Sequence, residues 1–365
     1  MLKVGIVGLP NVGKSSLFNA LTAVGVPSEN YPFCTVEPNI GTVEVPDPRL
    51  DRIHELTGSK EKVPTVIQFV DIAGLVKGAS EGEGLGNQFL GNIREVDAIA
   101  HVIRCFDDRD IAHVHGSVDP VRDRDIIQTE LVLADLEALE KRVDRVRKKA
   151  KTGEKEALRE LAVLEKALAP LEEGLPVRTV EFSDDETQVL RQFQLLTNKP
   201  VLYVANVAEE DLPTGENHWV AALQEAIEAD HDGRIVRICS KIESELAELE
   251  EEEQEMFLDE LGLDESGLDR LIHEAYKLLG LLTFFTTGEK ESRAWTVRQG
   301  ATAPNAAGSI HSDFERGFIR AETIGFDTFV EVGSWKAAKE SGQLRQEGKD
   351  YVVEDADIML FRFNV

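Results

Sequence analysis

Long apolar segments are missing from this chain of 365 residues. No run of about 18 apolar residues occurs, so no membrane-spanning helix is expected. Cysteine is also rare. Cys34, Cys105 and Cys239 lie far apart without a C-x-x-C pair, which favours small residues in a reducing, cytoplasmic compartment over a metal or redox role. The apolar N-terminus leads into a glycine motif rather than a cleavage site, so we interpret it as a first strand and not a signal peptide.

Positive charge is scarce, since 40 Lys and Arg face 68 Asp and Glu and leave a net charge of -28. A uniformly acidic protein would repel nucleic acid. The charge is uneven, however: Glu243–Glu265 holds twelve acids and no Lys or Arg, whereas Leu281–Val365 holds ten basic and thirteen acidic residues. This C-terminal segment is therefore the favoured place for an RNA contact. The acidic excess equally fits adaptation to high salt, which indicates nothing about partners.

Short apolar runs and helical patterns alternate in the first 110 residues, which indicates a mainly parallel α/β sheet. We expect strands at Lys3–Val7, Ile40–Val45, Val66–Val70, Ala98–Cys105, Val201–Val204 and Ile235–Ile238. Between the strands expected at Ala98–Cys105 and Val201–Val204, apolar residues recur at spacings of three and four over 132–146 and 157–168. This pattern predicts two antiparallel helices packed as a short coiled coil, followed by a third helix with a capping box at Ser183 and Glu186.

The expected domains are a split nucleotide-binding domain at 1–125 and 199–280, an inserted helical hairpin at 126–198, and a C-terminal α+β domain at 281–365. Leu268–Leu279 is expected to be the closing helix of the split domain. Within the C-terminal domain we expect a Gly/Ala/Pro-containing loop at Gly300–Gly308 and a final strand at Ile358–Phe363.

The most specific motif is Gly8-x-x-x-x-Gly13-Lys14-Ser15, which follows a strand and opens a helix. Its glycines let backbone N–H groups point at phosphates, and the helix N-terminus adds its positive end. Lys14 is expected to reach the β- and γ-phosphates of a nucleoside triphosphate, to be required for catalysis, and to lie free over the loop without a ligand. The nucleotide-binding residues that we expect are Asn11, Val12, Gly13, Lys14, Ser15, Ser16, Gly74, Asn206, Val207, Glu209 and Ser240.

Three oxygen-bearing side chains are expected to hold Mg²⁺. The Ser15 hydroxyl is a direct ligand, and Asp71, at the tip of a strand, acts through water. Thr35 is placed to complete the shell as a switch threonine. Gly74 follows Asp71 by three residues and is expected to donate its N–H to the γ-phosphate, which couples the next loop to the nucleotide state.

The base-reading segment departs from the Asn-Lys-x-Asp of guanine-specific enzymes. Here it is Asn206-Val207-Ala208-Glu209, so Lys is replaced by Val and Asp by the longer Glu. Guanine loses its carboxylate partner, whereas adenine, which lacks the N1–H and the 2-amino group, loses nothing. The segment therefore favours ATP or a relaxed choice of base, with Cys239-Ser240-Lys241 as the last base loop. The alternative is that Glu209 is only a surface acid.

Over its whole length the sequence resembles the YchF-type, Obg-related ribosome-binding ATPases. The segments that carry this resemblance are Gly8–Ser15, Asn30–Thr35, Asp71–Gly78, Gly82–Gln88, Asn206–Glu209, Gly300–Pro304 and Ile310–Ala321. The resemblance implies a P-loop G domain with an inserted antiparallel helical (coiled-coil) domain and a C-terminal β-grasp domain of the TGS type. It also implies ATP as substrate, Mg²⁺, a role in translation or stress, and binding to the large subunit or the whole ribosome. RNA would contact the TGS domain or the helical hairpin, and the protein would be a monomer without a membrane partner.

Leu75 stands where Ras-like enzymes have the glutamine that orients the attacking water. His113 and His115 are the nearest substitutes, and the resemblance favours His113 as the catalytic residue. Solvated loop histidines are the alternative. Two other functions remain open: an Obg-type GTPase, and a ribosome or RNA adaptor whose nucleotide is structural. A small-molecule kinase is disfavoured, because no motif for a second substrate occurs.

Overall fold

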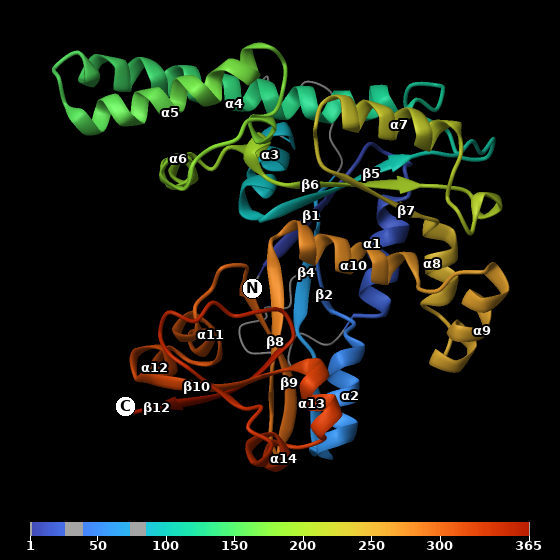
Figure 1. Ribbon diagram of the computed structural model, residues 1–365. Coiled ribbons are helices and arrows are strands. Elements are labelled where there is room, and N and C mark those ends of the chain that lie inside the picture. The colour runs from blue at the N-terminus through green and yellow to red at the C-terminus, as the bar shows by residue number, and fades with distance from the viewer. Residues whose placement is uncertain (1, 26–38, 74–84, 365) are drawn as a thin grey trace. The chain divides into compact units, whose positions relative to one another are not determined.

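The computed structural model describes residues 2–25, 39–73 and 85–364 (Figure 1). The chain forms two compact units, one from Met1–Val43 and Gln68–Ala275 and the other from Glu44–Ile67 and Tyr276–Val365. In these described ranges no helix is both long enough and apolar enough to cross a lipid bilayer.

A six-stranded sheet forms the centre of the first unit, with the strand order β2-β4-β1-β5-β6-β7. The strands are β1 (Lys3–Val7), β2 (Ile40–Glu44), β4 (Val66–Asp71), β5 (Ala98–Arg104), β6 (Val201–Asn206) and β7 (Arg234–Ile238). β1 pairs in parallel with β4 and β5, and β6 pairs in parallel with β5 and β7. Every residue of β5 and β6 is buried, as expected for central strands covered on both faces. The six strands lie within two residues of the expected ranges.

Helices stand between the strands of this sheet in the chain, and the last three of them follow its final strand, β7. They are α1 (Lys14–Ala23), α3 (Leu85–Glu95), α7 (His218–Ala229), α8 (Ser240–Leu246), α9 (Glu251–Leu261) and α10 (Gly267–Leu278). α1 buries Leu17, Phe18 and Leu21, and its opposite side stays exposed. A loop joins the carboxyl end of β1 to the first turn of α1. Ligands of open α/β sheets bind at this edge.

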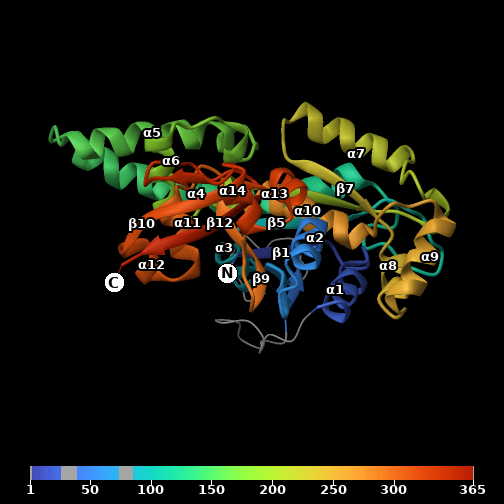
Figure 2. The same cartoon turned by 60° about the horizontal axis from the view of Figure 1, so that its bottom comes forward.

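A long helical arm interrupts the sheet between β5 and β6. α4 (Pro120–Ala150) and α5 (Lys155–Glu172) run antiparallel, and α6 (Asp184–Leu190) follows (Figures 1 and 2). The buried residues of the arm form one core that includes Leu139, Val143, Leu164 and Leu171. The predicted capping box of α6 is present: Ser183 accepts from the backbone of Glu186, whose side chain bonds back to Ser183.

Buried charges attach the arm to the sheet. Arg178, which follows α5, donates to Asp232, and the Tyr203 hydroxyl donates to the same carboxylate at 2.7 Å. Arg124 of α4 pairs with Asp230 at 2.6 Å. His101 of β5 lies 5.6 Å from the Tyr203 ring, and burial, aided by the positive charge of the two arginines, lowers the pKa of His101 to about 3. His101 therefore stays neutral at physiological pH, and the ionic contacts fix the base of the arm.

The second unit contains a sheet of its own, with the order β11-β10-β12-β8-β9-β3. Its strands are β3 (Glu61–Val63), β8 (Leu281–Thr287), β9 (Glu291–Arg298), β10 (Phe318–Gly325), β11 (Arg345–Glu347) and β12 (Asp357–Phe363). Its helices are α2 (Pro48–Thr57), α11 (Ala303–Ile310), α12 (Ser312–Arg316), α13 (Phe326–Val332) and α14 (Trp335–Glu340). Two hydrophobic cores lie in this unit, one around Phe284 and the other around Phe285, as the alternation of side chains along β8 requires.

The segment Glu44–Ile67 belongs to the second unit, although the expected boundaries placed it in the nucleotide-binding domain. β3 pairs in parallel with β9, and Leu50 and Ile53 of α2 join the core around Phe285. A chain of buried hydroxyls also links Ser59 to Ser292 at 2.9 Å. These contacts are long-range in sequence, so the local pattern of 44–67 does not reveal them.

The loop expected at Gly300–Gly308 is a helix over much of its length, and that expectation was wrong. α11 begins after Thr302, whose hydroxyl and backbone N–H bond to Asn305, and Pro304 stands in its first turn. A proline is tolerated there because the first N–H groups of a helix have no partner in the helix. Ala303, Ala306 and Ala307 are buried at helical spacing, so the small residues mark a packed helix.

Candidate functional site

The phosphate loop lies between β1 and α1, and its shape depends on two glycines. Gly13 has φ 95°, in the left-handed region, and a Cβ added there would collide with the side-chain amide of Asn206. A Cβ on Gly8 would stand 2.7 Å from the Val102 carbonyl oxygen. Asn11 also has a positive φ, 63°, which Asn tolerates better than most residues. Close approach thus requires both glycines, and the backbone conformation requires glycine at Gly13.

The N-terminus of α1 is open towards this loop. Gly13, the N-cap residue, has no side chain to cap it, and no acid occupies its first turn, so these residues leave its N–H groups and the helix dipole uncompensated. A cavity of about 830 Å³ lies here. Its lining includes Leu9, Pro10, Asn11, Gly13, Lys14, Ser15, Ser16, Phe106, Ile111, Asn206, Ser240, Lys241, Ser244 and Glu245. This phosphate cavity has the form and the donors that suit an anionic ligand.

Lys14 does not lie free, as the sequence led us to expect. Its Nζ forms an ion pair with Asp71, whose carboxylate is at the end of β4. The side chain is mostly buried, and a carboxylate is the nearest group that satisfies an ammonium there. The pair brings together two residues that the sequence assigned to the phosphates and to Mg²⁺.

Asn206 joins the two halves of the site. Its Nδ2 donates to the Val12 carbonyl in the phosphate loop at 2.8 Å, and its Oδ1 accepts from the Ser240 N–H at 2.9 Å. The side chain is buried, so both bonds are shielded from water. The Ser240 hydroxyl is buried without a hydrogen-bond partner among the described residues, and it lies in the lining of the phosphate cavity. It is therefore a donor still available to a ligand.

A second cavity, of about 380 Å³, adjoins the first, with Phe106, Ile111, Asn206 and Lys241 shared between them. We call it the base cavity, and its other lining residues are Asp107, Asp108, Val207, Ala208, Glu209, Glu210 and Cys239. Glu209 accepts a hydrogen bond from Lys241 Nζ at 2.7 Å, and both side chains are about half exposed or more. Burial raises the pKa of the Cys239 thiol, which therefore stays protonated in this wall.

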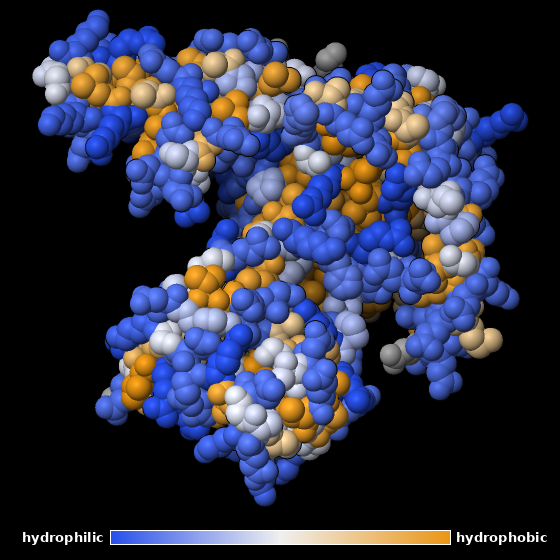
Figure 3. All heavy atoms as spheres, in the orientation of Figure 1, coloured by the Kyte–Doolittle hydropathy of each residue, from blue (hydrophilic) through white to orange (hydrophobic). Residues whose placement is uncertain are grey.

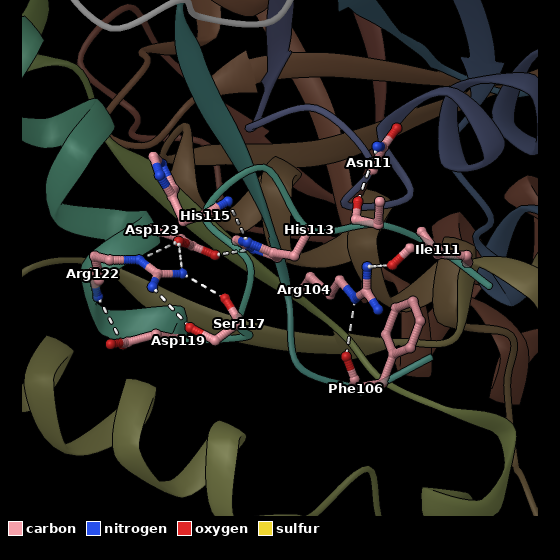
Figure 4. A network of polar contacts seen from close by, with 11 residues as sticks. Asn11, Arg104, Phe106, Ile111, His113, His115, Ser117, Asp119, Arg122 and Asp123 are labelled. Atoms are coloured by element: carbon pink, nitrogen blue, oxygen red, sulfur yellow. Dashed lines mark hydrogen bonds and ion pairs between the residues drawn. The ribbon is translucent and has the colours of Figure 1, made fainter. Parts of the chain in front are cut away.

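Arg104 was missed in the sequence because no motif marks it. Its guanidinium is 1% exposed and donates to three backbone carbonyls, those of Phe106, Asp108 and Ile111. The Arg104 guanidinium thus fixes the loop that contributes Phe106 and Ile111 to both cavities (Figure 4). A buried arginine at the end of a strand, followed by a loop rich in Asp, is the only signal that the sequence offers.

His113 is held away from water. Its Nε2 lies 2.8 Å from Asp123 Oδ2, its Nδ1 accepts from the His115 N–H at 3.1 Å, and its side chain is 5% exposed. Figure 4 shows the ring directed towards Asp123, at the start of α4. The backbone of the same loop contacts the phosphate loop, since Asn11 Nδ2 donates to the Ala112 carbonyl at 3.0 Å. His115 is exposed.

Thr35, Gly74 and Leu75 lie outside the described residues. Within the described part, no three His, Cys, Asp or Glu side chains gather as a metal-binding group. The Ser15 hydroxyl and the Asp71 carboxylate are nevertheless hard oxygen donors, and Mg²⁺ commonly takes only one or two protein ligands beside phosphate oxygens and water. The donor set therefore fits Mg²⁺ bound together with a nucleotide.

Two family models match the chain. Residues 3–149 match "50S ribosome-binding GTPase" (MMR_HSR1), and residues 281–364 match YchF-GTPase_C, described as "Protein of unknown function (DUF933)". The first match contains the phosphate loop and α4 as far as Lys149, and the second contains the part of the second unit from Leu281 to Asn364.

Three relatives align along the full chain. The chain is 55% identical to the ribosome-binding ATPase YchF of Bacillus subtilis, with 100% of both sequences covered. It is 54% identical to the ribosome-binding ATPase YchF of Escherichia coli O157:H7, covering 100% of this chain and 99% of the relative. The structure of the Schizosaccharomyces pombe YchF GTPase superposes with a TM-score of 0.89 at 40% identity, covering 99% of this chain and 97% of that one.

Proposed function

Because the chain belongs to the YchF family, we propose that it hydrolyses ATP in a Mg²⁺-dependent reaction and binds the ribosome as a nucleotide-dependent switch. The Bacillus and Escherichia relatives are ribosome-binding ATPases by name. The observation that carries the assignment is the continuity of two cavities: an uncapped helix N-terminus with Lys14 at one end and a base cavity without a guanine reader at the other.

The preference for ATP rests on Val207 and Glu209. Val207 is buried and has no polar group to offer a base. The Glu209 carboxylate, which would have to accept from guanine, already accepts from Lys241. Guanine would therefore have to share the Glu209 carboxylate with Lys241 or displace Lys241 from it, whereas adenine makes no such demand.

Mg²⁺ is proposed to bind Ser15 directly and Asp71 through water, with Thr35 as a further ligand. When bound, the ion neutralises charge on the β- and γ-phosphates. With the nucleotide bound, Lys14 can pair either with Asp71 or with the phosphates. We expect it to leave Asp71 for the phosphates, so the carboxylate is freed as the nucleotide enters.

The ribosome contact is proposed for the end of the helical arm. Arg142 and Arg147 pair there with Glu160 and Glu165. Four further exposed cations have no ion-pair partner in the described chain, and we call them the cationic tip: Arg145, Lys148, Lys149 and Lys151. Figure 3 shows hydrophilic residues along the edges of this end of the arm, on either side of a hydrophobic band. An RNA backbone suits such a surface on a chain of net charge -28.

The second unit is the other candidate contact with RNA, as a TGS-like domain of a cytoplasmic monomer. Two quadruple variants separate the candidates: the cationic tip changed to Gln, and the exposed lysines 290, 336, 339 and 349 of the second unit changed to Gln. Each variant removes four positive charges. Co-sedimentation with ribosomes at two salt concentrations should fall for the tip variant more than for the other. Equal retention of both would remove the tip from the proposal.

Phosphate release from ATP and from GTP, with Mg²⁺ and with excess EDTA, tests the enzymatic part. ATP hydrolysis that EDTA abolishes is the expected result, and turnover of GTP alone would contradict the base assignment. The GTPase alternative has support in the name of the Schizosaccharomyces relative. An adaptor with a structural nucleotide is favoured by the sequestered His113. Single-turnover hydrolysis of bound ATP distinguishes the adaptor from the enzyme.

A further inference from the structure

The tautomer of His113 follows from its two partners. Nδ1 accepts from the His115 N–H, so Nδ1 carries no proton and Nε2 carries the ring's only one. Nε2 therefore donates to Asp123 Oδ2. A neutral imidazole in this state has used its one lone pair and its one proton, so it cannot accept a hydrogen bond from a water molecule.

Asp123 is buried and held by hydrogen bonds from Arg122. It is 2% exposed, and its Oδ1 accepts from Nε and Nη2 of Arg122 at 3.1 and 2.9 Å. Arg122 also donates to the Ser117 carbonyl at 2.7 Å, and its backbone N–H is capped by Asp119. Arg122 thus ties the carboxylate that holds His113 to Ser117 and Asp119 (Figure 4).

The backbone before His113 is fixed to the phosphate side. Asn11 holds the Ala112 carbonyl, and Arg104 holds the Ile111 carbonyl at 2.9 Å. Ile111 lines the phosphate cavity, whereas His113 does not. The ring is therefore one residue away from a contact with the phosphate loop, yet its side chain is bound to the start of α4.

The following inference rests on the proposed function as a hydrolase. We propose that Asp123 is a positioning residue that retains His113 in an inactive position. His113 must then leave Asp123 before it can orient water. Asp123 lies in the first turn of α4, the same unbroken helix of 31 residues whose other end carries the cationic tip. The retaining contact and the proposed ribosome contact thus lie on one helix, and the stimulation by ribosomes measured below tests whether they are coupled.

The variant that tests this is Asp123→Asn, which keeps the shape and removes the charge. Charge-assisted hydrogen bonds are about twice as strong as neutral ones, so the released population should grow and kcat for ATP without ribosomes should rise on the order of tenfold, with KM unchanged. Asp119→Asn is the matched control, because Asn caps a helix as well as Asp does and residue 119 does not touch His113. Its kcat should stay at the wild-type value.

The double variant Asp123→Asn with His113→Ala should show the low kcat of His113→Ala alone, since the gain acts through the imidazole. Ribosomes should stimulate Asp123→Asn by a smaller factor than they stimulate the wild type. A kcat for Asp123→Asn at or below that of the wild type would overturn the proposal. The proposed function fails by a different result, the absence of ATP hydrolysis by the wild type itself.

A second measurement does not depend on how well the variant folds. Nitrogen NMR of ¹⁵N-histidine-labelled wild-type protein should show His113 as the neutral tautomer protonated at Nε2. A cationic ring, or a ring protonated at Nδ1, would overturn the retaining geometry.

Discussion

The phosphate cavity and the base cavity adjoin, but they are built in different ways. Half of the residues that line the phosphate cavity come from one contiguous segment, from Leu9 to Ser16, which forms a tight loop and the first turn of α1. The base end is made by side chains from three distant loops, around Phe106, Glu209 and Cys239. A backbone site tolerates little change, because its shape depends on glycines that a Cβ would obstruct. A side-chain site can change its ligand by substitution, which fits a fold that serves both ATP and GTP in different proteins.

The largest effect that separates the two ends should come from Lys14→Ala. The change removes the only side-chain cation that is expected at the γ-phosphate, and loss of one such group commonly costs about 10²–10³ in kcat or more. Turnover should become undetectable and ATP affinity should fall. The melting temperature should fall modestly, because the change leaves the Asp71 carboxylate, which is 25% exposed, without its ion-pair partner. Lys349→Ala, an exposed lysine of the second unit, is the control, and unchanged turnover by Lys14→Ala would refute the assignment of the phosphate site.

Asn206→Ala should weaken the phosphate cavity and the base cavity together, because Asn206 lines both. The change removes the bonds to the Val12 carbonyl and the Ser240 N–H inside a buried region. We expect unfolding free energy to fall by about 1–3 kcal/mol and ATP and GTP to be weakened by the same factor. Chemical denaturation and nucleotide titration measure the two effects. A loss confined to one nucleotide would mean that Asn206 reads the base rather than joining the loops.

A change at the base end alone should leave the phosphate end intact. Val207→Lys together with Glu209→Asp restores the guanine-reading residues, and it should move the ratio of ATP to GTP affinity towards GTP by about tenfold or more. Competition between the two nucleotides gives the ratio directly. Inorganic triphosphate should bind the variant as it binds the wild type, and an unchanged ratio would mean that these positions do not choose the base.

The smallest effect is expected from Lys241→Gln. The Lys241–Glu209 pair is exposed and screened by water, so its loss should leave the stability of the protein essentially unchanged. Freed from Lys241, Glu209 becomes available to guanine, and GTP affinity should rise by no more than about fivefold. Weaker binding of both nucleotides would instead indicate that Lys241 contacts the ligand.

The sequence predicted the phosphate end well, because its requirements are local. Gly8, Gly13, Lys14 and Ser15 are recognisable by spacing alone, and so are the strands that flank them. The ion pair of Lys14 was missed, since its partner Asp71 follows 57 residues later and was assigned to the metal. Arg104 was missed because its three partners are backbone carbonyls, which no sequence motif records.

Two further features of the structure could not be predicted from the sequence, because they also depend on contacts between side chains or strands. The transfer of 44–67 to the second unit depends on the pairing of β3 with β9, more than 200 residues away in the sequence. The restraint on His113 depends on which ring nitrogen faces Asp123 and which faces the His115 N–H. Periodicity and motif spacing describe neither long-range pairing nor the tautomer of a side chain.

The preference for ATP is tested most directly by calorimetric titration of the wild-type protein with non-hydrolysable ATP and GTP analogues, side by side and with Mg²⁺. A base cavity with Val207 buried and Glu209 bound to Lys241 predicts the lower Kd for the ATP analogue. A GTP analogue that binds tenfold more tightly than the ATP analogue would contradict it.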